Sequence, residues 1–184
     1  MNLFLLSLRP AAMATGHSDK HIVKMILEAT QVMSNAFHWY LQSDDAPYRK
    51  THAMHPVSVF VAQCPDHFHL VGRRLLAMCA EYTRRYNREH KCEAIAVGML
   101  TCPPDFTRRH PPVYANESQA FGAYGKYRVP LCMPSEFHHP NACVAYCNYY
   151  LHKLIELPKC RQWRRKRNNV ALPVYVRTLR TQAV

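Results

Sequence analysis

The chain has 184 residues, which suits one domain that buries about two-thirds of its unfolded surface without disulfides or metals. It carries 24 Lys and Arg against 12 Asp and Glu, a formal net charge of +12. Such an excess favours polyanions, because cationic side chains displace counterions from phosphate. Nucleic acid is therefore the expected partner, although a solvated positive surface would give the same balance.

Neither the cysteines nor the opening residues indicate a secreted or membrane protein. The eight cysteines are irregularly spaced, several on apolar faces, so we expect reduced thiols in an intracellular protein. The apolar run MNLFLLSL is too short to span a membrane. No basic residue precedes it and no convincing cleavage site follows it, so we do not expect a signal peptide.

The first predicted elements are an extended segment and two helices. The opening run reads as an extended piece covered by the core, and Pro10 then starts a short helical turn. From Asp19 to Leu41 apolar residues recur at helical spacing. We expect Ser18 to be the N-cap of this long helix and Asp19 to favour its first turn.

Prolines mark the helices that follow. Pro56 opens the short helix VSVFVAQ, and Pro65 opens a helix to about Tyr86. The helix from Pro65 has an apolar stripe and an expected basic back, because its four arginines lie mostly off the stripe: Arg73, Arg74, Arg84 and Arg85. Two more helices are expected, one over residues 90–100 and one that begins after His139-Pro140 and ends near residue 157.

The segment between these last two helices looks irregular. Residues 102–134 hold six prolines and two glycines and show no sustained period, which is typical of functional or mobile loops. We found no internal repeat and no β-rich region. The predicted fold is therefore mainly α: a single compact helical domain over residues 1–158, with a long Pro-rich irregular segment and a basic C-terminal tail over residues 159–184.

The tail opens with KCRQWRRKR, in which six of nine residues are basic. A charge run is usually a solvated surface, but an aromatic residue among arginines can stack on an exposed base while the cations hold phosphates. The residues expected to contact nucleic acid here are Arg161, Trp163, Arg164, Arg165, Lys166 and Arg167.

The stretch HSDKHIVKMILEA holds the candidate site. At helical spacing His17, His21, Lys24 and Glu28 share one face, with Lys20 beside them. An ordinary helix flank with a Lys24–Glu28 pair, worth about 0.3–0.5 kcal/mol, would explain the pattern. However, cations near a helix N-terminus oppose the macrodipole. They suit phosphate binding, or a lysine with a depressed pKa whose amine is nucleophilic.

A metal site is the rival chemistry. Nitrogen and oxygen ligands would come from His17, Asp19, His21, His52 and His55. No spacing among them matches an established zinc motif, and Cys143 and Cys147 lack the CxxC geometry. We therefore expect neither a metal nor another cofactor.

Several motifs together carry a family resemblance. The stretches are MNLFLLSL, SDKHIVKMILEATQVMS, YRKTHAMHP, LLAMCAEYTRRYNREHKCEAI, VPLCMPSEF and AYCNYYLHKL, in this order. They resemble a group of bacteriophage and large-virus proteins with a DKHxVKMxLE helix, an HxxHP element, an EYxxRYxxxHK segment and an AMPxE segment. The resemblance covers roughly residues 1–165. This group is similar to the phage pyrimidine-dimer DNA glycosylases, which are small, mainly helical proteins.

The resemblance implies a metal-free reaction on DNA. In those glycosylases an amine attacks the sugar anomeric carbon at a damaged pyrimidine, a Schiff base forms, and β-elimination can cut the strand. Their amine is the processed N-terminus, and a helix glutamate is the acid/base group. Only Glu28 carries over directly, because the bulk of Asn2 should hinder removal of Met1. The amine is then that of Met1, Lys20 or Lys24, or this branch is not a lyase.

The leading hypothesis is a viral DNA-repair or DNA-modification enzyme of glycosylase/AP-lyase type that acts on a pyrimidine lesion or base. Its candidate catalytic residues are Glu28, Lys24, Lys20, His21, His17 and Asp19, and its candidate substrate-binding residues are His52, His55, His90 and Lys91. The expected partner is double-stranded DNA, and no association with a membrane is expected. The protein should act in the host cytoplasm or nucleoid during viral infection. The alternatives are a non-catalytic nucleic-acid-binding protein and a metal-dependent nucleotide or DNA hydrolase. The basic tail departs from the tryptophan-rich ending of the group.

Overall fold

The computed structural model describes residues 2–41, 46–157 and 159, and in this part the protein is mainly helical, as predicted. The elements, in chain order, are α1 (Pro10–Gly16), α2 (Asp19–Leu41), α3 (Pro56–Ala62), α4 (Pro65–Tyr86), α5 (Cys92–Thr101), β1 (Phe121–Tyr124), β2 (Tyr127–Pro130), the 3₁₀ turn η1 (Ser135–Phe137) and α6 (Ala142–Glu156).

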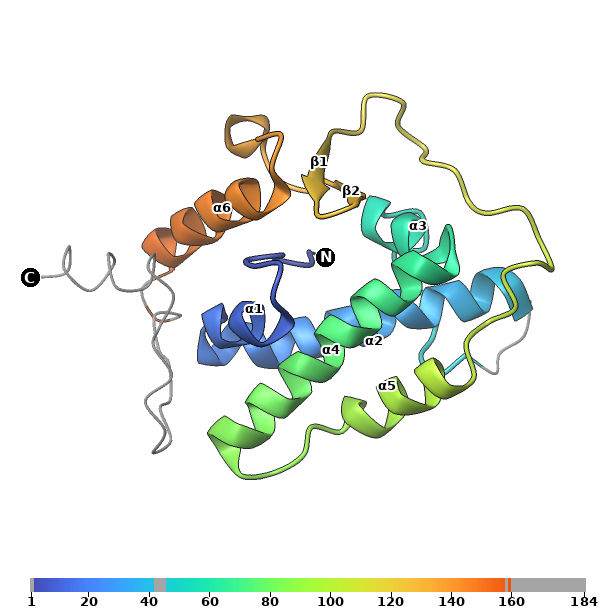
Figure 1. The fold of residues 1–184 in the computed structure, drawn as a ribbon, viewed down its shortest axis with the longest axis horizontal. Helices are drawn as coiled ribbons and strands as arrows, with labels where there is room; N and C mark the ends of the chain where they lie inside the picture. Colours follow the sequence, from blue (N-terminus) through green and yellow to red (C-terminus); the bar gives the residue numbers. More distant parts are fainter. Residues whose placement is uncertain (1, 42–45, 158, 160–184) are drawn as a thin grey trace, which may run out of the picture.

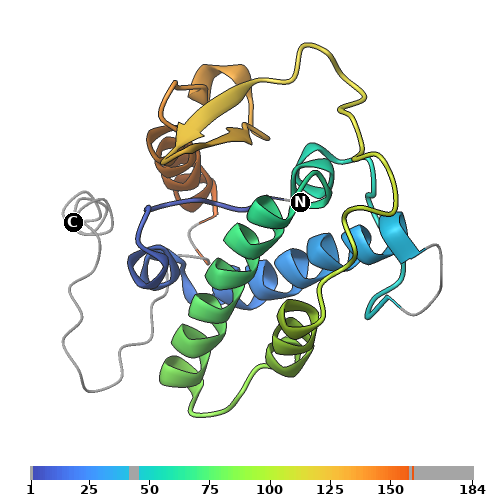
Figure 2. The same ribbon diagram turned by 45° about the vertical axis from the view of Figure 1, so that its right-hand side comes forward.

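Helices α2 and α4 form the centre of the molecule. They pack against each other, and α4 also packs against α1, α3 and α5 (Figure 1). The apolar stripes predicted for both helices face this core, where Ile22, Met33, Phe68 and Leu75 are fully buried. Helix α6 and the β1–β2 hairpin lie on the other side of the N-terminal segment, which therefore runs between two layers (Figures 1 and 2).

The N-terminal segment is extended and buried, as the sequence predicts. Leu3, Phe4, Leu5 and Leu6 are each less than a tenth exposed. Phe4 has a φ of 38°, and its carbonyl accepts a hydrogen bond from the Leu6 main-chain N at 2.8 Å, so the chain bends sharply here. The bend holds the start of the chain inside the fold.

The proline-based predictions for helix starts are confirmed, and one predicted cap is wrong. Proline occupies the first turn of α1, α3 and α4. Ser18 stands at the start of α2, where its carbonyl accepts from Ile22 N at 2.8 Å. However, its hydroxyl is buried and has no hydrogen-bond partner among the described residues. Asn141 does cap a helix with its side chain, because its Oδ1 accepts from Cys143 N and Val144 N at the start of α6.

The Pro-rich segment contains a β-hairpin that the sequence analysis missed. Its strands pair antiparallel with Tyr124 opposite Tyr127, and Gly125 takes a φ of 59° in the two-residue turn. Strands of four residues are too short to show a clear alternation. The Tyr124 hydroxyl fixes the hairpin, because it donates to Ser7 O at 2.6 Å and accepts from Arg74 Nε at 2.7 Å.

The expected basic back of α4 is partly wrong, because two of its four arginines are buried. Arg74 reaches the hairpin, and Arg85 is only 3% exposed. Arg85 donates to Thr15 O, His17 O, Asp19 Oδ1 and Glu81 Oε1 at 2.6–3.1 Å. Long cationic side chains at the edge of an apolar stripe can turn into the core when buried carbonyl and carboxylate oxygens accept hydrogen bonds from them.

Three other expectations concern the C-terminal tail, membrane-spanning helices and the cysteines. The predicted tail contacts Arg161, Trp163, Arg164, Arg165, Lys166 and Arg167 lie outside the described residues. Within those residues, no helix is long and apolar enough to cross a membrane. The seven cysteines in the described part of the chain are free thiols.

Candidate active site

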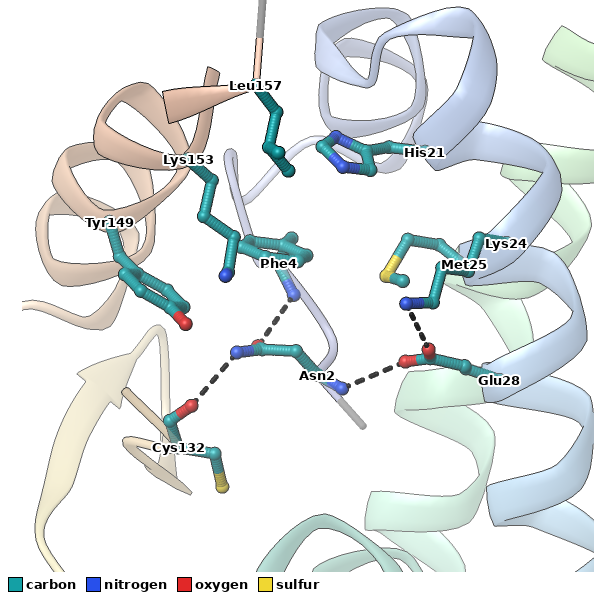
Figure 3. A pocket seen from close by; sticks show the side chains of 10 residues that line it. All are labelled: Asn2, Phe4, His21, Lys24, Met25, Glu28, Cys132, Tyr149, Lys153 and Leu157. Carbon is teal, nitrogen blue, oxygen red and sulfur yellow. Dashed lines mark hydrogen bonds and ion pairs between the residues drawn. The ribbon is translucent and has the colours of Figure 1, made fainter. Parts of the chain in front are cut away.

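A pocket of about 300 Å³ lies where the N-terminal segment meets α2 and α6 (Figure 3). One wall comes from α2, the opposite wall from α6, and the floor from the N-terminal segment and the segment after β2. The lining residues are Asn2, Phe4, His21, Lys24, Met25, Glu28, Cys132, Tyr149, Lys153 and Leu157. Three of the residues that the sequence placed on one helix face, His21, Lys24 and Glu28, therefore meet here.

Glu28 has a nitrogen close to each of its carboxylate oxygens. Its Oε2 accepts a hydrogen bond from the main-chain N of Asn2 at 3.1 Å, and its Oε1 lies 3.5 Å from Lys24 Nζ (Figure 3). The Glu28 side chain is 15% exposed, whereas that of Lys24 is 67% exposed. The carboxylate is therefore sheltered, with one nitrogen on the inner side and one toward solvent.

Asn2 is held in place by its side chain. Its Nδ2 donates to Cys132 O at 3.0 Å, and its Oδ1 accepts from Phe4 N at 3.3 Å. The side chain thus ties the start of the chain to the segment after β2 and directs the Asn2 main-chain N toward Glu28. Sequence reasoning missed this role of Asn2. The buried opening run was the only signal that the chain starts inside the fold.

His21 forms the upper part of the α2 wall. Its ring stacks on Phe4, with 6.1 Å between centroids, and its Nδ1 lies 2.9 Å from the Tyr150 hydroxyl. Burial lowers the pKa of His21 below its usual 6.5, and the charges of Lys24 and Lys153 lower it further. The ring is therefore neutral near pH 7.

Cations flank the pocket on both sides. Lys24 comes from α2, and Lys153 comes from α6, where its Nζ lies 4.9 Å from the centre of the Tyr149 ring. Glu28 is the one carboxylate among the lining residues of this pocket. The rim is suited to a phosphate group, and the half-buried ring of Tyr149 beside it offers an aromatic surface to a base.

A second pocket, of about 420 Å³, adjoins the first and shares Cys132 and Tyr149 with it. Its lining includes His55 and Gln119. His55 Nδ1 accepts from Val57 N and so caps α3. Burial lowers the pKa of His55, and the nearby His52 also lowers it. The HxxHP element therefore brings its second histidine to the site, while exposed His52 bonds to Thr51 Oγ1 at 2.7 Å.

The sequence comparison agrees with this geometry. The model of the pyrimidine dimer DNA glycosylase family matches residues 1–94, half of the chain. This protein belongs to the pyrimidine dimer DNA glycosylase family. The match confirms the resemblance seen in the sequence and implies a DNA substrate. No curated protein and no solved structure matches the chain.

The family match covers only part of the pocket of this glycosylase-family protein. It includes the N-terminal segment and α2, and therefore Asn2, His21, Lys24 and Glu28. Cys132, Tyr149, Lys153 and Leu157 come from beyond residue 94. The wall that faces Glu28 across the pocket is thus built by the part of the chain that the family model does not match.

Two of the candidate catalytic residues of this family member lie at the junction of α1 and α2 rather than in the pocket. The expectation that His17 shares the α2 face is wrong, because α2 begins at Asp19 and His17 belongs to the turn before it. His17 is fully buried, and its Nδ1 donates to Met13 O at 2.9 Å. Burial lowers its pKa to about 3. Asp19 forms an ion pair with Arg85.

Three further candidates also lie outside both pockets. Lys20 is exposed, one turn before Lys24. His90 Nδ1 accepts from Cys92 N at 3.1 Å at the start of α5, and its ring packs edge-on against Tyr82. Lys91, next to it, is exposed. These positions belong to the surface of α2 and to the α4–α5 junction.

The ligand set considered for a metal is not assembled in the described part of the chain. No three His, Cys, Asp or Glu side chains there are placed to hold one ion. His17 and Asp19 instead bind Met13 O and Arg85, respectively.

Proposed function

We propose that the protein is a DNA repair enzyme that breaks the glycosidic bond of a pyrimidine in a dimer lesion of double-stranded DNA and then cuts the strand as an AP lyase. The observation that carries the proposal is the hydrogen bond between the Asn2 main-chain N and Glu28, in a cation-flanked pocket. Family membership supports the DNA substrate. We also propose that it acts inside a virus-infected cell, which rests on the resemblance to viral proteins alone.

The chemistry begins at the deoxyribose C1′ atom of the damaged nucleotide. A neutral amine forms a bond to C1′, the C1′–N1 bond to the pyrimidine breaks, and the electron pair leaves with the base. Glu28 accepts the proton that the attacking amine loses and returns it to the sugar ring oxygen as the ring opens to a Schiff base. Loss of a C2′ proton then expels the 3′ phosphate by β-elimination.

We propose the nitrogen of Asn2 as the nucleophile. This choice requires that residue 1 be removed, although the bulk of Asn2 should slow that step. Its removal would turn this nitrogen into an α-amine 3.1 Å from Glu28 Oε2, on the sheltered side of the carboxylate. An α-amine is more nucleophilic than a lysine side chain at neutral pH, because its ordinary pKa is about 8 rather than about 10. Lys24, which is largely exposed and lies 3.5 Å from Glu28 Oε1, is the rival amine.

Borohydride reduction on dimer-containing and on abasic duplex DNA tests the proposal. A Schiff base will be reduced to a stable protein–DNA adduct, and mass spectrometry of its peptides will locate the nitrogen. We expect the adduct on the first residue of the mature chain, and Lys24→Gln should still form it. A control variant at exposed Lys126 should behave like the wild-type protein. The absence of an adduct on either DNA would rule out the lyase.

A further inference from the structure

The buried hydroxyl of Tyr150 joins Ser18, the residue before α2, to His21 within α2. It accepts a hydrogen bond from the Ser18 main-chain N at 2.8 Å, and it lies 2.9 Å from His21 Nδ1. The Tyr150 side chain is fully buried. A main-chain N–H can only donate, so the bond from Ser18 uses a lone pair of the hydroxyl oxygen. The hydroxyl can also donate its own proton, and His21 Nδ1 lies within hydrogen-bond distance of it.

We propose that Tyr150 is a positioning residue that donates its hydroxyl proton to His21 Nδ1 and so fixes His21 in the tautomer that carries its proton on Nε2. A ring nitrogen that accepts a hydrogen bond carries no proton, and a neutral imidazole has its one proton on the other nitrogen. Because His21 lines the pocket, this N–H becomes a permanent hydrogen-bond donor to whatever binds there.

The surroundings hold this arrangement firmly. Rings of Phe4 and His17 pack against Tyr150 with centroid distances of 4.9 and 5.6 Å, and the His21 ring meets it at 5.1 Å. Ser18 is fixed in turn, because its carbonyl starts the hydrogen bonds of α2. Neither the tyrosine nor its donor can move away without disturbing the junction of α1, α2 and α6.

The Nε2–H donor suits a phosphate oxygen of the bound strand. Lys24 and Lys153 supply positive charge on either side of His21, and both lower its pKa. A neutral histidine between two lysines adds a directed hydrogen bond without adding a third cation. The donor role in turnover rests on the proposed function, whereas the tautomer is a property of the free protein.

The tautomer is measured directly by ¹⁵N NMR of the histidine rings in the free, labelled protein, with His21→Gln used to assign the signals. We expect His21 Nε2 to carry the proton in the wild type. In Tyr150→Phe, the Nδ1–H form should become populated. Tyr146→Phe is the matched control, because Tyr146 is equally buried and donates to Pro130 O, but has no hydrogen bond to His21. It should leave the His21 signals unchanged.

Activity on dimer-containing DNA gives a second readout. We expect Tyr150→Phe to lower kcat/KM about tenfold and Tyr146→Phe to change it little. A glutamine places an amide donor near the position of Nε2, so in a His21→Gln background the Tyr150→Phe substitution should have little further effect. A purely structural role for Tyr150 would instead cost the same in both backgrounds and would overturn the proposal.

The two readouts separate this inference from the function on which it rests. A proton on Nδ1 in the wild type, or a tautomer that Tyr150→Phe leaves unchanged, would overturn the role of Tyr150. If the NMR result is as expected and the protein has no activity on dimer DNA, the tautomer assignment stands and the proposed function fails.

Discussion

Glu28 and His17 show how strongly the surroundings of a single residue decide what its side chain can do. Glu28 keeps part of its surface in contact with solvent and accepts a hydrogen bond from the main-chain N of Asn2. His17 comes from the same short stretch of sequence but is fully buried in the turn between α1 and α2. We therefore propose proton transfer as the role of Glu28, and we expect His17 to make stability depend on pH.

Replacement of Glu28 by glutamine should abolish turnover while DNA binding survives. The amide keeps the shape of the side chain but cannot take a proton from the attacking amine. Acid/base groups of this kind contribute about 10²–10⁴-fold to rate, so a loss of at least that size is expected in single-turnover cleavage of dimer DNA. Glu117→Gln, at an exposed position, is the control. Equal activity in the two variants would remove Glu28 from the mechanism.

His17 should make the protein less stable in mild acid. Its pKa in the folded protein is about 3, below the usual 6.5. Below pH 6.5 the unfolded chain therefore binds a proton on His17 that the folded protein does not bind. The free energy of unfolding should therefore fall by roughly 1.4 kcal/mol per pH unit on account of this residue. Urea unfolding between pH 6 and about pH 4 should show a steeper decline for the wild type than for His17→Gln. Parallel declines would contradict this prediction.

At the scale of the elements, one buried arginine joins three helices. Arg85 of α4 donates to carbonyls at the end of α1 and to Asp19 in the first turn of α2. Burial alone would raise the pKa of Glu81, but hydrogen bonds from Arg84 and Arg85 lower it below its usual value. This junction sets where α2 begins, and therefore which of its residues face the pocket.

Loss of the Arg85 guanidinium should strongly destabilise the fold. Arg85→Gln leaves the buried carboxylates of Asp19 and Glu81 without their shared cation, and breaking a buried pair in this way costs about 3–5 kcal/mol. Arg84→Gln, which removes the 31% exposed neighbour, should cost only about 1 kcal/mol or less. Denaturant unfolding of both variants measures the difference. Similar midpoints would show that the junction is not a main source of stability.

Charge acts at the scale of the whole molecule. The net charge of +12 is spread over the chain, and residues 159–167 alone carry six basic side chains. Binding to duplex DNA should therefore weaken steeply as salt rises, because each bound phosphate releases counterions. In the proposed function the cations around the pocket position the reacting strand, whereas the tail is expected to add affinity that does not depend on sequence.

Alanine at Arg164, Arg165, Lys166 and Arg167 should make DNA binding less sensitive to salt. The slope of log affinity against log salt should shrink by about 0.9 for each phosphate that the variant no longer neutralises, with little change in sequence preference. The free energy of unfolding should change by no more than about 0.5 kcal/mol if the segment lies outside the core. An unchanged slope would mean that other cations hold the DNA. A large loss of stability would mean that the segment packs into the fold.

The sequence by itself determined the helices and one wall of the site. Local features were sufficient to predict the helices, because a helix is favoured by the apolar periodicity of its own residues and by proline in its own first turn. His21, Lys24 and Glu28 could be grouped for the same reason, since residues three and four apart on a helix are neighbours. The hairpin was not predicted, because its strands are only four residues long and show no clear alternation of apolar and polar residues.

Only the tertiary structure decided what faces Glu28. Asn2 lies 26 residues away from it along the chain, and Tyr150 lies 129 residues from His21, yet hydrogen bonds join both pairs. No local pattern encodes such pairings, because they depend on how the N-terminal segment packs between α2 and α6. The same packing buries His17 completely and leaves His21 in the pocket lining, although both rings pack against Tyr150. The spacing of residues along a helix shows which side chains share a face. Only the packing of the folded core decides whether that face contacts solvent, a carboxylate or a second helix.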